Sequence, residues 1–206
     1  MNVDISAYAI FVVDDDAAVT KALSRVLSLG GWRVQTFASA EAFLEARAPD
    51  AAGCLVLDVN LPGLNGLALQ QRLRETGEDL PIVFLTGHGD IPMSVRAMKA
   101  GASDFLTKPV RGEALDAALR AAIETHASQQ RHDGDTRTLR KRLDALTPRE
   151  REVLAEIVAG KLNKQIAFDL GIVEQTVKYH RARIMERMQA KSVAELMHIV
   201  ARARAD

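Results

Sequence analysis

The sequence has almost no cysteine and no apolar run of membrane-spanning length. Its 206 residues include one cysteine, Cys54, which excludes an internal disulfide and any zinc site built from several cysteines. Cys54 lies in the apolar run CLVL, so we expect a buried thiol, with a catalytic thiol as the alternative. A membrane-spanning helix needs about 18 or more apolar residues, which no segment supplies. The amino terminus also lacks the basic region of a secretory signal, so we expect a cytoplasmic protein with no membrane partner.

The chain also lacks net charge, but this balance hides an asymmetry. The whole sequence has 27 Lys and Arg against 27 Asp and Glu. Residues 1–125 have 11 basic and 16 acidic residues, a net charge of −5, whereas residues 126–206 have 16 basic and 11 acidic residues, a net charge of +5. Such a split indicates two modules, the basic one being a candidate for binding nucleic acid. A chance division of surface charge is the alternative, which only motifs can exclude.

Apolar runs of strand length alternate with amphipathic segments through the acidic part. The predicted strands are residues 9–13, 33–37, 53–57, 81–86 and 103–107. The predicted helices are residues 17–29, 39–47, 65–76, 92–101 and 112–125. Five repeats of strand and helix predict an α/β fold with a parallel, doubly wound sheet. In such a sheet, ligands bind at the carboxyl ends of the strands.

The pattern changes after residue 125. Residues 126–142 are polar and charged with no apolar face, which predicts either a linker or a solvated helical extension. Residues 143–206 have helical patterns throughout. Thr147 as N-cap, with Pro148 and Glu150 behind it, predicts a capping box at the start of the first of these helices.

Three further helices are predicted in the basic part. They cover residues 163–171, 174–188 and 192–204. The first two are joined by a short turn at Gly171, which is typical of a helix-turn-helix. The basic part is therefore predicted to be a small all-α domain.

Carboxylates follow two of the predicted strands. Asp14 and Asp15 come after the first strand and Asp58 after the third, and neighbouring strands would bring the three together. Close carboxylates repel one another unless a cation neutralises them, and oxygen ligands favour Mg²⁺, with Mn²⁺ as the alternative. Because Mg²⁺ commonly bridges carboxylates to phosphate, the sequence predicts a site that handles phosphate. We expect Asp15 to bind the metal directly and Asp14 through water.

Two other strand ends carry groups that phosphoryl transfer uses. Thr86 offers a hydroxyl group and Lys108 a positive charge. Pro109, after the lysine, is a candidate for a cis peptide bond. A carboxylate can accept a phosphoryl group, and Asp58 is the best acceptor because the other two aspartates would bind the metal. Each residue alone has an ordinary alternative as a helix cap, a backbone partner or a solvated lysine, but their joint placement favours a site.

These residues lie in segments that resemble the receiver domain of two-component response regulators of the FixJ/NarL type: VVDDD, LDVNLPGLNG and FLTGHGDIPMSVRAMKAGASDFLTKP. The resemblance implies a flavodoxin-like (βα)5 fold over residues 1–125 and phosphorylation of Asp58 by a sensor histidine kinase. It implies Mg²⁺ bound by Asp14, Asp15 and Asp58 with the backbone carbonyl of Asn60. It also implies a switch pair, Thr86 and Phe105, in which the ring follows the threonine towards the phosphoryl group.

Two polar residues near these motifs are not expected to take part in phosphorylation. We assign Asp16 to capping the helix that begins near Ala17. We expect His88 to be an exposed loop histidine and not a catalytic base.

The segments LTPREREVL, GKLNKQIAFDLGI and TVKYHRARIMERM resemble the LuxR-type helix-turn-helix. Val177, Ile184 and Met188 recur at helical spacing, which predicts that they face the small core and leave a polar face for the major groove of DNA. The candidates for contact with base edges or nearby phosphates are Gln175, Thr176, Lys178 and Tyr179, and those for contact with phosphate are Asn163, Lys164, Arg181 and Arg183.

Val173 departs from the LuxR-type pattern, which commonly has Ser or Thr before the recognition helix. The side-chain N-cap is therefore absent, and such a cap contributes about 0.5–2 kcal/mol. We expect the start of this helix to be less ordered until it contacts DNA.

The combined motifs predict a phosphorylation-dependent transcriptional regulator and not an enzyme. Phosphorylation would either release the basic domain or form a homodimer that places two recognition helices on inverted half-sites of promoter DNA, with RNA polymerase as a further partner. One alternative is a degenerate receiver that binds DNA or docks proteins constitutively. A second is a phosphotransferase with an Asp nucleophile, which Asn60 disfavours because such enzymes need an acid two residues after the nucleophile. A third is a structural flavodoxin-like domain, although no segment resembles a flavin phosphate loop.

Overall fold

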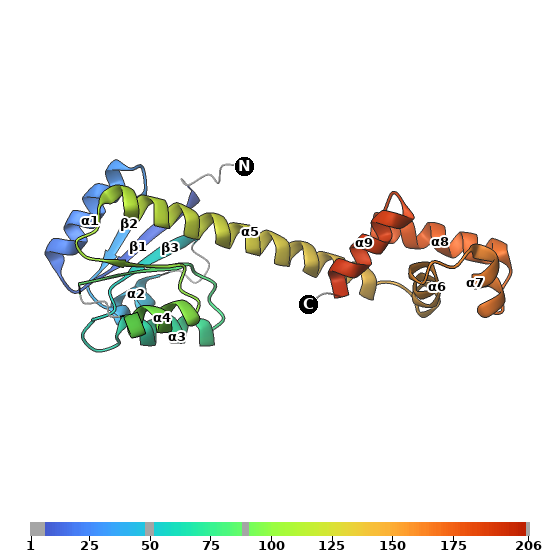
Figure 1. The fold of residues 1–206 in the computed structure, drawn as a ribbon, viewed down its shortest axis with the longest axis horizontal. Coiled ribbons are helices and arrows are strands. Elements are labelled where there is room, and N and C mark those ends of the chain that lie inside the picture. Colours follow the sequence, from blue (N-terminus) through green and yellow to red (C-terminus); the bar gives the residue numbers. More distant parts are fainter. Residues whose placement is uncertain (1–6, 48–51, 88–90, 205–206) are drawn as a thin grey trace. The chain divides into compact units, whose positions relative to one another are not determined.

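A sheet of five parallel strands forms the first part of the chain (Figure 1). The computed structural model describes residues 7–47, 52–87 and 91–204, so His88 lies outside the described residues. The sheet has the order β2-β1-β3-β4-β5, which confirms the predicted α/β fold. The strands are β1 (Ala9–Val13), β2 (Arg33–Phe37), β3 (Gly53–Leu57), β4 (Ile82–Thr86) and β5 (Asp104–Thr107).

Helices cover both faces of this sheet. They are α1 (Ala17–Leu29), α2 (Ala40–Ala46), α3 (Gly66–Glu75), α4 (Ile91–Lys99) and α5 (Gly112–Asp144). Alternate residues of a strand point to opposite faces, so Ile10 and Val12 pack in the core that includes α1 and α5, whereas Phe11 and Val13 pack in the core that includes α2 and α3. The strands β1, β3 and β4 are thus buried on both faces, which explains their continuous apolar sequence.

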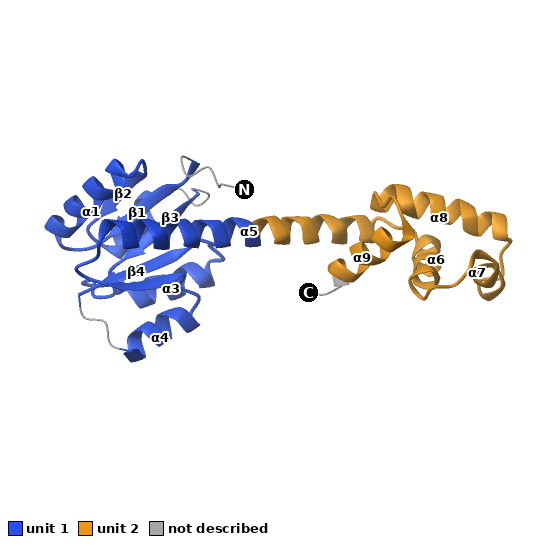
Figure 2. Cartoon of the chain, turned by 45° about the horizontal axis from the view of Figure 1, so that its top comes forward, with its two compact units in different colours: residues 1–129 blue, residues 130–206 orange. Residues whose placement is uncertain are grey.

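The chain divides into two compact units, residues 1–129 and residues 130–206 (Figure 2). The second unit contains the last part of α5 and the helices α6 (Pro148–Val158), α7 (Asn163–Asp169), α8 (Glu174–Met188) and α9 (Val193–Arg204). Val177, Ile184 and Met188 are fully buried in its core, as predicted. The described residues include no helix with the length and apolar character that a membrane span requires.

The polar segment at residues 126–142 is helical and continues α5 to Asp144. Of the two possibilities left open by the sequence, the structure therefore has the helical extension. The extension contacts α9 within the second unit, because the Nε of Arg140 donates to the carbonyl of Ala203 at 3.2 Å. Thr136 is buried in the same region. The amphipathic pattern of residues 126–142 is weak because few of their side chains are buried against the rest of the protein.

The predicted capping box begins α6. The hydroxyl of Thr147 accepts from the backbone N–H of Glu150 at 3.2 Å, and the Glu150 carboxylate accepts from the N–H of Thr147 at 2.9 Å. The hydrogen bond from the Thr147 N–H to the carboxylate is the main cause that holds the pKa of Glu150 below its ordinary value. The local sequence signal was sufficient here, because both partners of the motif lie three residues apart.

Candidate functional site

Parallel pairing of β1 with β3 places two acidic residues side by side. Val13 is in register with Leu57, and each is followed by an aspartate, Asp14 or Asp58. The backbone N–H of Asp58 donates to the carbonyl of Val13 at 2.9 Å, which continues the ladder to the sheet edge. Both aspartates are buried, with 3% and 8% of their surface exposed.

A third carboxylate, that of Asp15, completes the acidic cluster. One oxygen from each of Asp14, Asp15 and Asp58 lies within 4.8 Å of the others. Asp15 is exposed, whereas the other two are buried. A set of oxygen donors at this spacing suits a hard divalent cation such as Mg²⁺, so the residues present fit the predicted metal.

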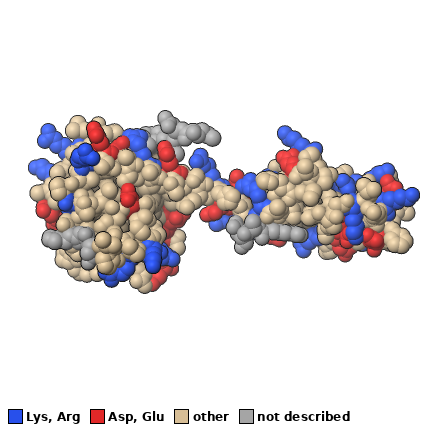
Figure 3. All heavy atoms as spheres, viewed as in Figure 1, with Lys and Arg blue, Asp and Glu red and all other residues tan. Residues whose placement is uncertain are grey.

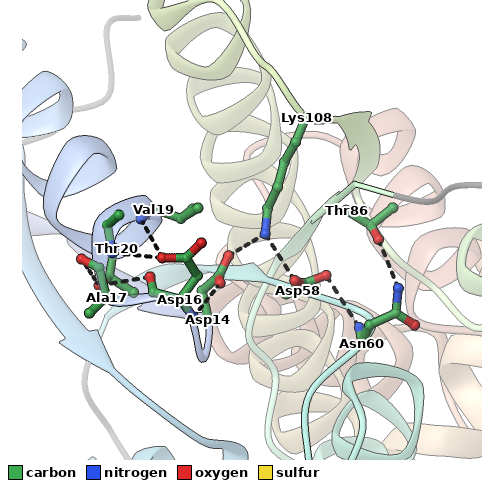
Figure 4. Close-up of polar contacts among 10 residues, drawn as sticks. Asp14, Asp16, Ala17, Val19, Thr20, Asp58, Asn60, Thr86 and Lys108 are labelled. Atoms are coloured by element: carbon green, nitrogen blue, oxygen red, sulfur yellow. Dashed lines mark hydrogen bonds and ion pairs between the residues drawn. The ribbon is translucent and has the colours of Figure 1, made fainter.

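The ammonium group of Lys108 bridges two of these carboxylates (Figure 4). Its Nζ lies 2.5 Å from Oδ2 of Asp14 and 2.9 Å from Oδ2 of Asp58. Partial burial acts to lower the pKa of Lys108, but the hydrogen bonds and charges of the two aspartates outweigh burial and raise this pKa above its ordinary value. Lys108 is therefore charged at neutral pH. The peptide bond between Lys108 and Pro109 is cis, as the sequence suggested.

The three consecutive aspartates have two different roles: Asp14 and Asp15 belong to the acidic cluster, and Asp16 caps a helix. Oδ1 of Asp16 accepts from the N–H of Ala18 at 2.7 Å and from that of Val19 at 3.4 Å, so Asp16 is the N-cap of α1, as predicted. The backbone N–H of Asp16 in turn donates to Oδ1 of Asp14 at 3.0 Å. Both oxygens of Asp14 therefore have partners, one in the backbone and one in Lys108.

Thr86 and Asn60 form the opposite side of the site (Figure 4). Thr86 ends β4 and is fully buried, and its hydroxyl accepts from Nδ2 of Asn60 at 3.5 Å. The backbone N–H of Asn60 donates to Oδ1 of Asp58 at 3.2 Å. From the sequence, only the carbonyl of Asn60 was assigned a role, whereas the structure also brings its N–H and side chain into the site.

Phe105 lies on β5, next to β4. It is in register with Phe84, and the two ring centroids are 6.1 Å apart. Thr86 is two residues beyond Phe84 on the same strand, and Phe105 is partly buried. The predicted switch residues thus lie on neighbouring strands. Phe105 is paired with Phe84, two residues before Thr86, which ends β4.

Gly66, which the sequence analysis did not single out, is packed against the backbone of Asp58. A β-carbon at Gly66 would lie 2.3 Å from the carbonyl oxygen of Asp58 and 3.0 Å from Cα of Val59. Gly66 is the first residue of α3, capped by Asn65, whose side chain accepts from the N–H of Ala68 at 2.9 Å. The sequence offered one signal for this close packing: a glycine, which is a poor helix former, stands directly after the N-cap Asn65.

Cys54 is fully buried in β3, and its burial raises the pKa of the thiol well above the ordinary value. A thiol that stays protonated and has no access to solvent is a poor nucleophile. The structure therefore agrees with a core thiol and not with a catalytic one.

The predicted DNA-contacting residues lie in two groups on the second unit. Gln175, Lys178 and Tyr179 are exposed in the first turns of α8, and Thr176 is partly exposed there. The other group consists of Asn163, Lys164, Arg181 and Arg183, of which the first three line one groove of about 590 Å³.

Acidic neighbours accompany some of these basic residues. Lys178 pairs with Glu174 at 3.2 Å, and Arg183 pairs with Glu186 at 3.2 Å. On the face shown in Figure 3, basic and acidic side chains are interspersed over this unit. The N-cap residue of α8, Val173, makes no side-chain hydrogen bond, in agreement with the missing cap in the sequence.

Two family profiles match the chain. The receiver-domain profile, described as "Response regulator receiver domain", matches residues 10–120, and "Bacterial regulatory proteins, luxR family" matches residues 144–200. The first covers the acidic cluster, and the second covers α6 to α8 and most of α9.

Similar proteins match over nearly the whole chain. The response regulator protein TmoT of Ectopseudomonas mendocina is 46% identical over 94% of this chain and 88% of its own length. The transcriptional regulatory protein FixJ of Bradyrhizobium diazoefficiens is 40% identical over 94% of this chain and 95% of its own length. Among solved structures, the response regulator StyR has 45% identity and a TM-score of 0.84, over 95% of this chain and 98% of its own. Full-length FixJ from B. japonicum has 39% identity and a TM-score of 0.61, over 98% and 99%.

Proposed function

We propose that phosphorylation of Asp58 controls the binding of this chain to DNA. The premise is that the chain belongs to the response regulators that join a receiver domain to a LuxR-type DNA-binding domain, which are the transcription regulators of two-component systems. A sensor histidine kinase is the proposed phosphoryl donor. The phosphorus–nitrogen bond of its phosphohistidine breaks as a bond forms between phosphorus and a carboxylate oxygen of Asp58.

The position of Asp58 is the observation that carries this proposal. It directly follows the buried central strand β3, one of its oxygens accepts from Lys108 at 2.9 Å, and the other accepts from the N–H of Asn60 at 3.2 Å. Asp16 caps α1, and Asp14 and Asp15 are the proposed metal ligands, so Asp58 is the proposed acceptor of the phosphoryl group. Lys108 is positioned to bind an added phosphoryl oxygen through its charge.

The proposed metal is Mg²⁺, with Mn²⁺ as a substitute of similar preference. Asp15 is the proposed direct ligand, because its carboxylate is exposed, and Asp14 is proposed to act through water. Asp58 and the backbone carbonyl of Asn60 would complete the protein ligands. Bound there, Mg²⁺ supplies neutralisation of the phosphoryl charge.

Thr86 and Phe105 are the proposed switch. Thr86 is held by Asn60 at 3.5 Å, a long hydrogen bond that a phosphoryl oxygen on Asp58 can replace. Movement of Thr86 vacates space on β4 beside β5, and we propose that Phe105 follows inwards with α4. The added charge at Asp58 is thereby converted into a change of surface.

A receiver homodimer is the change of surface that we favour over simple release of the DNA-binding unit. Ile91, Val95 and Met98 are 79%, 45% and 44% exposed on α4. Their spacing places them on one face of the helix, and an apolar stripe of this kind suits a second copy of the chain. A dimer would present two α8 helices to inverted half-sites, roughly 34 Å apart.

Promoter DNA is the proposed partner of the second unit. Gln175, Thr176, Lys178 and Tyr179 are proposed to contact base edges or nearby phosphates, and Asn163, Lys164, Arg181 and Arg183 phosphates. We propose that the chain acts in the cytoplasm as a regulator and not as an enzyme, and that RNA polymerase is a further partner if the chain activates transcription.

The test of this function is chemical phosphorylation of two variants of the full chain. Asp58→Asn should abolish incorporation of phosphate from acetyl phosphate in the presence of Mg²⁺, measured by intact-protein mass spectrometry. Asp16→Asn is the matched control, because asparagine caps a helix as well as aspartate does and the acceptor is untouched. Normal phosphorylation of the Asp58→Asn variant, or loss in both variants, would contradict the assignment of the acceptor.

A further inference from the structure

Two side chains of α3 bind the carboxyl-terminal end of α4. Nε2 of Gln70 donates to the carbonyl of Ala97 at 3.2 Å, and Nη1 of Arg74 donates to the carbonyl of Ala100 at 3.2 Å. The two donors are four residues apart, so they lie on one face of α3. Figure 1 shows α3 and α4 next to each other on the same side of the sheet.

The helix that receives these bonds is mostly exposed. Of the residues in α4, all described, Ala97 alone is buried, and the rest are partly or fully exposed. Grooves of about 610 and 280 Å³ flank the contact, and Gln70, Arg74 and Ala100 line both. The hydrogen bonds from α3 therefore act on the end of α4 together with the burial of Ala97 and Ala102 in the core.

The Gln70 amide is only half satisfied in this arrangement. The residue is 1% exposed, and its Oε1 has no hydrogen-bond partner among the described residues. The reverse orientation of the amide would set Oε1 against the Ala97 carbonyl, so the donor must face α4. The buried amide of Gln70 therefore has its donor committed to α4.

The same face of α3 begins at the phosphoacceptor. Gly66, Gln70 and Arg74 recur at four-residue intervals, and Gly66 packs directly on the Asp58 carbonyl. One short helix thus contacts the backbone of Asp58 at its first residue and the end of α4 at its fifth and ninth. This contact acts on the same helix, α4, that the proposed switch through Thr86 and Phe105 moves.

We propose that Gln70, assisted by Arg74, is a positioning residue that holds α4 in the position seen here and so opposes a modification of Asp58 that moves α4. The inference rests on the proposed function of Asp58. Because coupling between two sites is reciprocal, releasing α4 must favour the modified state of Asp58 by the same factor. Loss of one hydrogen bond of ordinary strength corresponds to a factor of about two to ten.

The test titrates the full chain with beryllofluoride in the presence of Mg²⁺, with bound fluoride followed by ¹⁹F NMR. Gln70→Met keeps the size of the side chain and removes the donor, and it should lower the half-saturating concentration about two- to tenfold. Gln71→Met is the matched control, because the Gln71 amide bonds Glu75 within α3 and does not bond α4, so it should titrate as the wild type does. Amide hydrogen exchange at Ala100–Ala102 should quicken in Gln70→Met and not in Gln71→Met.

Arg74→Met provides a second variant in a more exposed position, with a change in the same direction. If Gln70→Met and Arg74→Met both titrate like Gln71→Met, or more weakly, the positioning role is wrong. If the wild type itself binds no beryllofluoride, the proposed function of Asp58 fails, which is a different result.

Discussion

At the scale of single residues, Lys108 determines the electrostatics of the site. Its ammonium lies between Asp14 and Asp58, whose side chains are 3% and 10% exposed, and these carboxylates keep its pKa raised. A lysine with a raised pKa retains its charge, and the stability that follows from it, until the pH rises through that value. At neutral pH, the single charge of Lys108 therefore offsets part of the negative charge of the two carboxylates without a metal.

Lys108→Met should make the fold depend on Mg²⁺. Without the ammonium, buried carboxylates lose a partner, and we expect the free energy of unfolding in metal-free buffer to fall by roughly 1–3 kcal/mol. Because a ligand of the native state stabilises it, millimolar Mg²⁺ should raise Tm more in this variant than in the wild type. Thermal unfolding followed by circular dichroism measures both shifts.

The control for this experiment is Lys21→Met, which removes an exposed lysine of α1 in the same unit. It should leave the effect of Mg²⁺ on Tm unchanged. Equal effects of Mg²⁺ on the wild type and on Lys108→Met would show that Lys108 does not neutralise the metal-binding carboxylates.

At the scale of elements, α1 and α6 begin with side-chain N-cap hydrogen bonds, whereas α8 begins without one. Asp16 caps α1 and the Thr147–Glu150 capping box starts α6, but α8 begins after Val173, which offers no acceptor. The backbone of Val173 is extended, with φ −82° and ψ 149°, which is the conformation of an ordinary N-cap. Only the side chain is wrong for the position.

Val173→Ser should therefore stabilise the start of α8. A serine hydroxyl can accept from a free N–H of the first turn, which contributes about 0.5–2 kcal/mol. Amide hydrogen exchange of the full chain without DNA should slow at residues 174–178, with Val173→Ala as the control that removes the side chain without adding a cap. Strong protection of these amides in the wild type would contradict the weak start of the helix.

At the scale of the whole molecule, the proposed activation creates an assembly of two chains. The apolar stripe of α4, Ile91, Val95 and Met98, is the surface proposed for it, and its exposure in a single chain favours burial against a second copy. Burial of such side chains is the main favourable contribution to association, so a charge within the stripe should prevent it.

Val95→Asp should remain monomeric under conditions in which beryllofluoride and Mg²⁺ convert the wild type to a dimer. Sedimentation velocity of the full chain measures the change. Leu29→Asp is the control, because Leu29 is 82% exposed on α1, away from the stripe, and it should dimerise normally. A Val95→Asp chain that dimerises like the wild type would place the dimer interface elsewhere.

Much of this protein could be predicted from local patterns in its sequence. The strands at 9–13 and 53–57 match the structure because buried strands appear in the sequence as short apolar runs, and the predicted strand at 33–37 also matches although it is largely exposed. The caps by Asp16 and Thr147 were predicted because the interacting groups lie within three residues of each other. The acidic cluster followed from strand order alone, since the ends of neighbouring parallel strands must meet.

What only the tertiary structure decided depends on contacts between distant segments. Residues 126–142 could be linker or helix by pattern, and contact with α9 accompanies the helical form. Gln70 looks like an ordinary polar residue in an amphipathic helix, yet it is buried against α4, and Gly66 matters only because Asp58 lies against it. The sequence by itself therefore determined the elements and the chemistry of the site, whose causes are local. Folding decided which side chains meet across the sheet edge and between helices, because that depends on where residues far apart in the chain are brought together.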